Sequence, residues 1–208
     1  MNRDIFLNEI VFGWIKRDFE RMVGEIPVRP GEAGNINFFL ALNVLASMES
    51  LGGFLLGEDR KFEENTKEYI SRCFSNPGEY KIEILKDIYR NGLAHEFFPR
   101  GAVSRDGEHP AIFVDGKIGI VLDAETLAND FLSSLEKFRS ELDEEKYNSR
   151  MQELKQSTQR FLSAHEEIID NLPKKTTTTS INTSTSSVSN ESDSYSAVST
   201  PPPFEKEE

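Results

Sequence analysis

Several residue types that support common protein chemistries are scarce in this chain. The 208 residues include a single cysteine, Cys73, so no intrachain disulfide can form. No cysteine or histidine pair has the spacing of a zinc site, and neither a phosphate-binding loop nor a glycine-rich dinucleotide fingerprint is present. The sequence therefore predicts no metal and no cofactor.

Basic residues are few relative to acidic ones. The chain has 24 Lys and Arg against 36 Asp and Glu, which gives a formal net charge of −12. An acidic protein of this kind binds duplex nucleic acid poorly through non-specific phosphate contacts. The charge argues against a general nucleic-acid coat or architectural role, and it leaves room for a small basic pocket on an acidic body.

Signals for export or for a membrane span are also lacking. Residues 1–4 have neither the basic nor the apolar region of a signal peptide. The longest apolar segment, residues 38–56, is broken by polar residues and contains the adjacent glycines Gly52 and Gly53. We interpret this segment as a core helix, and we expect a cytoplasmic protein without membrane contact.

Apolar residues recur at helical spacing along most of the chain and predict a helical bundle. The fourth helix has a clear start signal, because Asn76 can cap it and a proline and a glutamate follow at favoured first-turn positions. Residues 99–110 are rich in glycine and charge, so a loop is expected there. The first four expected helices cover about residues 3–23, 37–56, 60–74 and 77–98.

One β-hairpin interrupts the helical pattern. Two short apolar runs within residues 111–121 are joined by Asp115-Gly116, and this dipeptide is typical of a tight hairpin turn. Asp123 follows the second run and has the side chain of a helix cap. A further helix is therefore expected from about Ala124.

The C-terminal part of the chain contains two apolar stripes and a polar tail. The first stripe runs from Leu127 to Leu142, and the second runs from Tyr147 to Ile168 at near-heptad spacing. The second stripe is either a separate helix that folds back or an extension that meets a partner. Of the 35 residues from 174 to 208, 16 are Ser or Thr, which cannot bury a core, so this tail is expected to be disordered.

These patterns define an expected fold class and domain organisation. The class is all-α: a bundle of four to five helices with one small β-hairpin and a long C-terminal helical region. The bundle is expected over residues 1–142, the helical extension over 143–173 and the disordered tail over 174–208.

The most informative motif is the hexamer Arg90-Asn91-Gly92-Leu93-Ala94-His95. It combines a permanent cation with an imidazole, and this pair suits phosphate chemistry. On a straight α-helix, Arg90 and His95 would lie about 140° apart, so their side chains would not converge. Gly92 could loosen the turn between them, or a second copy of the chain could bring the two residues together.

The hexamer resembles the Arg-x4–6-His motif of the HEPN superfamily, including the frequent Asn after the Arg. The longer run through Gly101 also resembles a set of uncharacterised bacterial HEPN-like proteins. The resemblance covers about residues 3–142 and implies a bundle of four or five helices with the motif on a late helix. Many members are metal-independent ribonucleases of toxin–antitoxin, CRISPR and phage-defence systems that dimerise with their motifs facing. Others have lost activity and act as binding or regulatory modules.

The ribonuclease interpretation assigns a role to three residues. His95 would move the proton of the attacking ribose 2′-hydroxyl. Arg90 would stabilise charge on the phosphate, and Asn91 would orient the imidazole or a phosphate oxygen. The structural alternative is that Arg90 and His95 only complement the dipole at a helix C-terminus.

Three further residues are candidates for support of the site. Glu49 lies within the most apolar helix, where an unpaired carboxylate is costly, so a pair with Arg90 or with a helix-end donor is expected. Arg100 and Arg105 follow the motif and would add positive charge around a substrate, unless they are merely solvated.

Two functions follow from the sequence. The first is a HEPN-like metal-independent endoribonuclease of toxin or defence type, with RNA as substrate, a homodimer as its assembly and an antitoxin or other protein as partner. The alternative is a non-catalytic helical interaction or regulatory protein that self-associates through its last helices.

Overall fold

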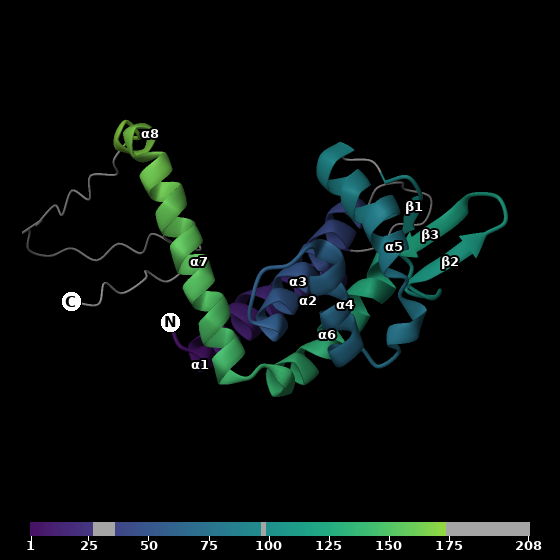
Figure 1. Ribbon diagram of the computed structural model, residues 1–208. Helices are drawn as coiled ribbons and strands as arrows, with labels where there is room; N and C mark the ends of the chain where they lie inside the picture. The colour runs from purple at the N-terminus through teal and green to yellow at the C-terminus, as the bar shows by residue number, and fades with distance from the viewer. Residues whose placement is uncertain (27–35, 97–98, 174–208) are drawn as a thin grey trace, which may run out of the picture. The chain divides into compact units, whose positions relative to one another are not determined.

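The computed structural model describes residues 1–26, 36–96 and 99–173 of the chain. These residues are mostly helical and include a small three-stranded sheet (Figure 1), so the predicted helical character is confirmed. Residues 2–156 form one compact unit, and the described residues 157–173 belong to a second unit. The predicted disordered tail lies outside the described residues.

The elements before the sheet are α1 (Arg3–Ile5), η1 (Phe6–Lys16), α2 (Arg17–Gly24), α3 (Asn37–Leu56), α4 (Phe62–Cys73), η2 (Pro77–Glu79), α5 (Ile82–Ile84), η3 (Leu85–Arg90) and η4 (Gly92–Glu96). The sheet consists of β1 (Ala102–Ser104), β2 (Ile112–Asp115) and β3 (Gly119–Asp123). The helices after the sheet are α6 (Ala124–Glu141), α7 (Glu144–Ala164) and α8 (Glu166–Asp170).

Helix α3 is the central element of the compact unit. It begins and ends at the residues that the apolar pattern predicts, and half of its residues are buried. It packs against α4 and α6, and the approach to α4 is so close that a Cβ atom at Gly52 would lie 1.9 Å from the backbone oxygen of Asn65. Among the described residues, α3 is the one helix long and apolar enough to cross a membrane. A helix buried against α4 and α6 needs the same apolar composition, and the sequence predicts such a core helix here.

The N-terminal helix has an unusual winding. It is continuous from Arg3 to Gly24, as predicted, but residues Phe6–Lys16 are π-helical, with bonds between residues five apart. Its buried residues Phe6, Leu7 and Val11 join the core of the compact unit. The hydrophobic pattern predicts the burial of this helix correctly, and it does not distinguish π from α winding.

The predicted start of the fourth helix is wrong. Pro77–Glu79 forms only a single 3-10 turn, and the Asn76 side chain makes no capping hydrogen bond. Tyr80 then leaves the helical conformation, packs edge-on against Phe74 at 4.8 Å and donates a hydrogen bond to Asp130. This tertiary anchoring of Tyr80 overrides the local start signal, so that the helix begins at Ile82.

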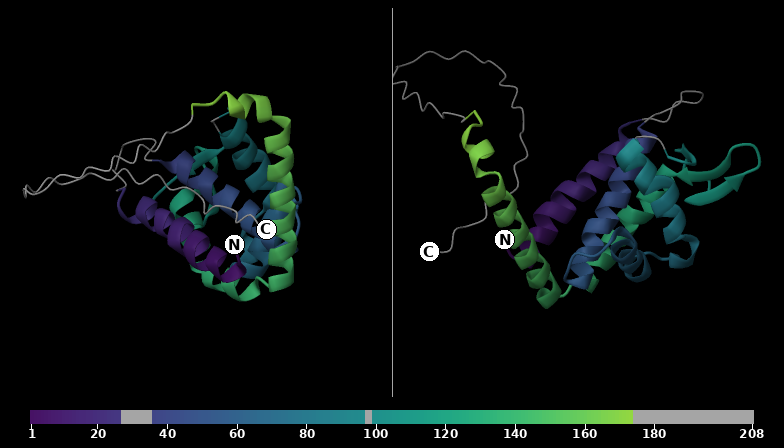
Figure 2. Two further views of the ribbon diagram at one scale, coloured as in Figure 1. Left: turned by 90° about the vertical axis from the view of Figure 1, so that its left-hand side faces the viewer. Right: turned by 45° about the horizontal axis from the view of Figure 1, so that its top comes forward.

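The sheet contains the predicted hairpin and one strand that was not predicted. Strands β2 and β3 pair antiparallel around a turn in which the Asp115 carboxylate accepts hydrogen bonds from two backbone N–H groups. The expected loop over residues 99–110 instead includes β1, which pairs parallel with β3 and gives the order β1-β3-β2. The register joins Ala102 to Val121, a separation that no local pattern reveals. The sheet lies at one end of the helical unit (Figure 2), where Asn37 of α3 donates to the Val103 carbonyl at 3.3 Å.

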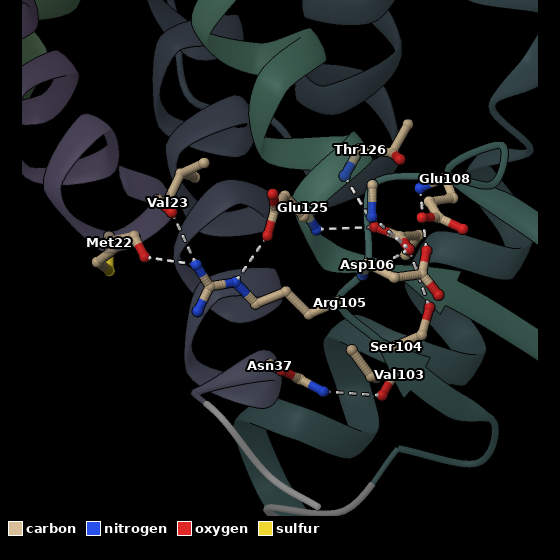
Figure 3. A network of polar contacts seen from close by, with 12 residues as sticks. Met22, Val23, Asn37, Val103, Ser104, Arg105, Asp106, Glu108, Glu125 and Thr126 are labelled. Carbon is tan, nitrogen blue, oxygen red and sulfur yellow. Dashed lines mark hydrogen bonds and ion pairs between the residues drawn. The ribbon is translucent and has the colours of Figure 1, made fainter. Parts of the chain in front are cut away.

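A polar network joins the sheet to the start of α6 (Figure 3). Asp123 is fully buried and caps α6, as predicted, by accepting bonds from the N–H groups of Glu125 and Thr126 at 3.0 and 2.9 Å. Its other oxygen accepts from Ser104 Oγ at 3.1 Å and from the N–H groups of Asp106 and Gly107 at 3.2 and 3.3 Å. One carboxylate therefore holds β1, the turn after it and α6 together.

A second carboxyl group within this network titrates abnormally. A hydrogen bond with Asp123, followed by burial, raises the pKa of Asp106. Burial alone would raise the pKa of Asp123, but the hydrogen bonds donated by Thr126 and Asp106 outweigh it and lower that pKa. The folded state therefore holds a proton on Asp106 more tightly than the unfolded chain does.

We predict that Asp106→Asn stabilises the protein at neutral pH. The proton on Asp106 favours folding below the unfolded pKa, and that contribution is lost as pH rises through the raised folded pKa. An amide donates to Asp123 at every pH, so the variant should gain up to about 1 kcal/mol of unfolding free energy at pH 7. Urea unfolding at several pH values should show that the gain vanishes in acid. A gain of equal size at all pH values would contradict the prediction.

Helices α6 and α7 are separate elements. Leu142 adopts an extended conformation after α6, and the Asp143 carboxylate accepts from the Lys146 N–H at 2.8 Å as α7 begins. Tyr147 and Met151 are buried in the core of the compact unit, which extends to Gln156. The first three turns of α7 thus belong to the same unit as the bundle.

Candidate functional site

The Arg90–His95 hexamer lies on two consecutive π-helical segments, η3 and η4. The backbone N–H of Asn91 bonds to the Lys86 carbonyl, five residues earlier, where an α-helix would use a partner four residues earlier. A π turn therefore places residue i+5 above residue i. The divergence expected on a straight α-helix does not apply to this segment, because its winding is wider, in line with the alternative of a loosened turn near Gly92.

Arg90 and His95 meet within one copy of the chain. Arg90 Nη1 lies 3.3 Å from His95 Nε2. A guanidinium group only donates hydrogen bonds, so His95 Nε2 accepts in this contact when that nitrogen carries no proton. No second copy is needed to bring the two side chains together.

Glu49 of α3 holds the other side of the Arg90 guanidinium. Its Oε2 atom lies 3.5 Å from Arg90 Nη2, which confirms the predicted pair of Glu49 with Arg90. The two side chains are 28 and 29 % exposed, so the ion pair is partly shielded from water and remains open to it on one side. The guanidinium carbon also lies 5.7 Å from the centre of the Phe62 ring on α4.

Phe62 is a member of the site that sequence reasoning assigned only to the core. Its ring is buried and forms a wall against which Arg90 rests, an arrangement in which the ring face attracts the cation. The apolar spacing on α4 predicts the burial of Phe62, but no local signal indicates which cation it meets. Elements α3, α4 and η3 together fix the Arg90 guanidinium, while His95 projects from η4 and is exposed.

The other predicted residues occupy different environments. Asn91 lies between Arg90 and η4, half-buried, and its side-chain amide makes no hydrogen bond with the described residues. Arg100 is largely exposed, and its Nη2 lies 3.7 Å from Glu96. It remains close to the motif, because its backbone N–H donates to the Ile88 carbonyl at 3.0 Å.

Arg105 is not brought to the Arg90–His95 pair. Only 1 % of its side chain is exposed, and it bonds to Glu125 and to the carbonyls of Met22 and Val23 at 3.1, 2.8 and 3.0 Å (Figure 3). It thereby satisfies carbonyl groups in the last turn of α2 and contributes to the fold. The expectation that Arg105 adds positive charge around a substrate is therefore corrected.

Comparison with known proteins leaves the site to be interpreted from its own geometry. The chain matches no protein-family model, no curated protein and no solved structure. Among the described residues, no group of three or more His, Cys, Asp and Glu side chains could hold a metal ion. What remains is a partly shielded guanidinium beside an exposed imidazole.

This arrangement has two chemical capabilities. The imidazole Nε2 accepts a proton from a hydroxyl group once that group displaces the Arg90 contact. The guanidinium has five N–H donors in a planar fork that fits phosphate oxygens, and within the described part of the chain two of its nitrogens contact acceptors. A proton acceptor and an anion-binding group thus lie within one hydrogen-bond distance of each other.

Proposed function

We propose that this chain is a HEPN-like, metal-independent endoribonuclease of toxin or defence type, acting in the cytoplasm. The single observation that carries the proposal is the 3.3 Å contact between Arg90 and His95, two residues five apart that the π winding of this segment brings together. The resemblance of the hexamer to the HEPN motif supplies the reaction class. Homodimers and an antitoxin-like protein partner belong to the same proposal.

The proposed reaction is internal transesterification of RNA. The ribose 2′-oxygen attacks the adjacent phosphorus, and the bond from phosphorus to the 5′-oxygen breaks. His95 accepts the 2′-hydroxyl proton, and the leaving 5′-oxygen takes a proton from the imidazolium or from water. The products are a 2′,3′-cyclic phosphate and a 5′-hydroxyl end, and no metal ion or oxidant is required.

Arg90 stabilises the transition state in this proposal, and Glu49 positions Arg90. The phosphate gains negative charge at its non-bridging oxygens during attack, and a guanidinium that is already in place stabilises that charge without reorganisation. Glu49 and Phe62 hold the guanidinium in the free protein. Asn91 is free to orient a phosphate oxygen, since its amide is not engaged by the described residues.

The proposal predicts that Arg90→Ala and His95→Ala each reduce RNA cleavage by at least about 100-fold. His95→Ala removes an exposed side chain and should leave the melting temperature nearly unchanged, whereas Arg90→Ala leaves Glu49 without its partner and should lower the melting temperature by a few degrees. Purified proteins are incubated with single-stranded and hairpin RNAs in the presence of EDTA, and the ends of the products are identified. Arg21→Ala changes an exposed arginine on α2 outside the proposed site, serves as the matched control and should retain wild-type cleavage.

Two results would overturn the ribonuclease proposal. One is wild-type protein that leaves all RNAs intact, and the other is residual cleavage that survives both substitutions and therefore comes from a contaminant. The second candidate function would then hold: a non-catalytic helical interaction protein in which the Arg90, Glu49 and Phe62 contacts only tie η3 to α3 and α4.

A further inference from the structure

Strand β2 lies at an open edge of the sheet. Among the described strands, the order β1-β3-β2 leaves β2 with β3 as its one neighbour (Figure 1). The opposite edge, at β1, is occupied by α3, because Asn37 donates to the Val103 carbonyl at 3.3 Å. Within the described residues, no donor or acceptor meets the outer side of β2 in this way. An open strand edge is a surface to which another strand can be added.

The hydrogen-bond pattern of the hairpin shows which backbone groups point to this edge. The Asp123 N–H donates to the Ala111 carbonyl at 2.9 Å, so these two residues form a hydrogen-bonded pair. In an antiparallel ladder such pairs alternate with pairs whose N–H and C=O groups point away from each other. The register places Ile112 and Val114 in pairs of the second kind. The N–H and C=O groups of Ile112 and Val114 therefore point to the open edge.

Apolar side chains accompany these backbone groups. Val114 is 76 % exposed, whereas Ile112, on the same face of the strand, packs against the core. Phe113 lies on the other face, and its ring centre is 4.7 Å from that of His109. Ile118 in the turn is 67 % exposed. The edge thus presents a short apolar strand whose outward hydrogen-bonding groups have no partner among the described residues.

We propose that two copies of this chain associate by pairing their β2 strands antiparallel, which joins the two sheets into one. With the two-fold axis at Phe113, Ile112 of each copy lies opposite Val114 of the other. The outward N–H and C=O groups of these residues then bond across the interface, and the two Phe113 rings meet at the axis. The interface does not rest on the proposed ribonuclease, because neither Arg90 nor His95 takes part in it.

Charge favours a second copy in this direction. In the antiparallel register Asp115 lies opposite Ala111 of the other copy, whereas a parallel pairing in register would place the two Asp115 carboxylates side by side. The antiparallel register also brings the exposed Lys117, which follows the strand, toward the exposed Glu108, which precedes it in the other copy. Opposite charges therefore meet at both ends of the pair. The edge is complementary to itself in hydrogen bonding, apolar contact and charge.

The first test is the oligomeric state of the full chain by sedimentation equilibrium over a range of concentrations. Wild type should be a concentration-dependent dimer. Val114→Pro removes an N–H that points to the edge and none that the pairing of β2 with β3 uses, so it should raise the dissociation constant at least about 10-fold. Val114→Ile keeps the N–H and an apolar branched side chain, serves as the matched control and should dimerise like wild type.

Two outcomes of this test would overturn the proposal. One is a wild-type monomer at every concentration, in which case a strand from a different protein remains as the occupant of the edge. The other is a dimer that Val114→Pro leaves intact. Circular dichroism and urea unfolding show whether the proline variant retains the fold, and the second test uses no proline.

The second test determines the direction and register of the pair by disulfide trapping. Phe113→Cys and Lys117→Cys are made as separate single variants, and the buried Cys73 does not compete for oxidation. In the proposed pair the two Cys side chains at position 113 face each other at the axis, so Phe113→Cys should form a linked dimer. The two positions 117 lie at opposite ends of the pair, so Lys117→Cys should not. Absence of linkage in Phe113→Cys, or equal linkage in both variants, would overturn the antiparallel pairing.

Discussion

Gly52→Ala is expected to destabilise the compact unit by about 3 kcal/mol or more. A Cβ atom built at this position would lie 1.9 Å from the backbone oxygen of Asn65 and 2.5 Å from its carbonyl carbon. The obstacle is backbone rather than a flexible side chain, so α3 and α4 would have to move apart. Overpacking a core usually costs about 1–3 kcal/mol, and a clash of this depth lies at the upper end.

The neighbouring glycine provides a matched control for this prediction. At Gly53 the nearest atom to an added Cβ is Arg150 Nε at 3.3 Å, a side-chain atom that can shift by a few tenths of an ångström. Both substitutions also gain helix propensity of about 1 kcal/mol from the change of glycine to alanine. Gly53→Ala should therefore be close to neutral. Urea unfolding of both variants decides the matter, and equal stabilities would contradict the close approach of α3 to α4.

The second large effect is expected for Asp123→Ala, with a loss of about 3 kcal/mol of unfolding free energy. The change removes the cap of α6, worth about 1 kcal/mol, and leaves the donors on Ser104, Asp106 and Gly107 without their acceptor. Each buried donor that loses its partner costs about 1–3 kcal/mol. Water reaches some of these donors after the substitution, which keeps the total loss below the sum of the separate costs. The three connected segments should loosen together.

Asp115→Ala is the control for Asp123→Ala. It removes the same chemical group from an exposed position, so a difference between the two variants reports the effect of burial. The Asp115 carboxylate also accepts from two backbone N–H groups, at 2.7 and 3.0 Å, but it does so at the exposed hairpin turn. Water replaces those bonds, so the expected loss is below about 1 kcal/mol. Comparable losses for the two variants in thermal or urea unfolding would show that the network around Asp123 is not cooperative.

The sequence predicts the features that depend on neighbouring residues. A 20-residue segment that is apolar nearly throughout, between two breaks, predicts both ends of α3. Asp115-Gly116 predicts the hairpin and Asp123 predicts the helix cap by their side-chain chemistry. The pairing of Glu49 follows from the cost of leaving a carboxylate alone on an apolar helix.

The features that depend on distant residues could not be predicted in this way. Strand β1 exists because β3 pairs with it from nineteen positions away in the Ala102–Val121 register. Tyr80 leaves the helix because Phe74 and Asp130 bind it, and Arg105 is buried because α2 presents carbonyl groups to it. The winding of η3 and η4 is also a tertiary outcome, because the same residues would fit an α-helix by pattern alone.

The π turn at the hexamer bears on how paired side chains are recognised in other proteins. Surveys of helical sequences for cooperating residues usually look at separations of three and four, since those share a face in an α-helix. Here a separation of five produces the contact, because the wider turn absorbs one extra residue. If one residue between Arg90 and His95 were deleted and the segment were wound as an α-helix, the two residues would be four apart. Their side chains would then again lie on one face of the helix. Sequence distance and helical pitch can therefore compensate for each other, and alignments that penalise a one-residue gap between such groups will overlook equivalent pairs.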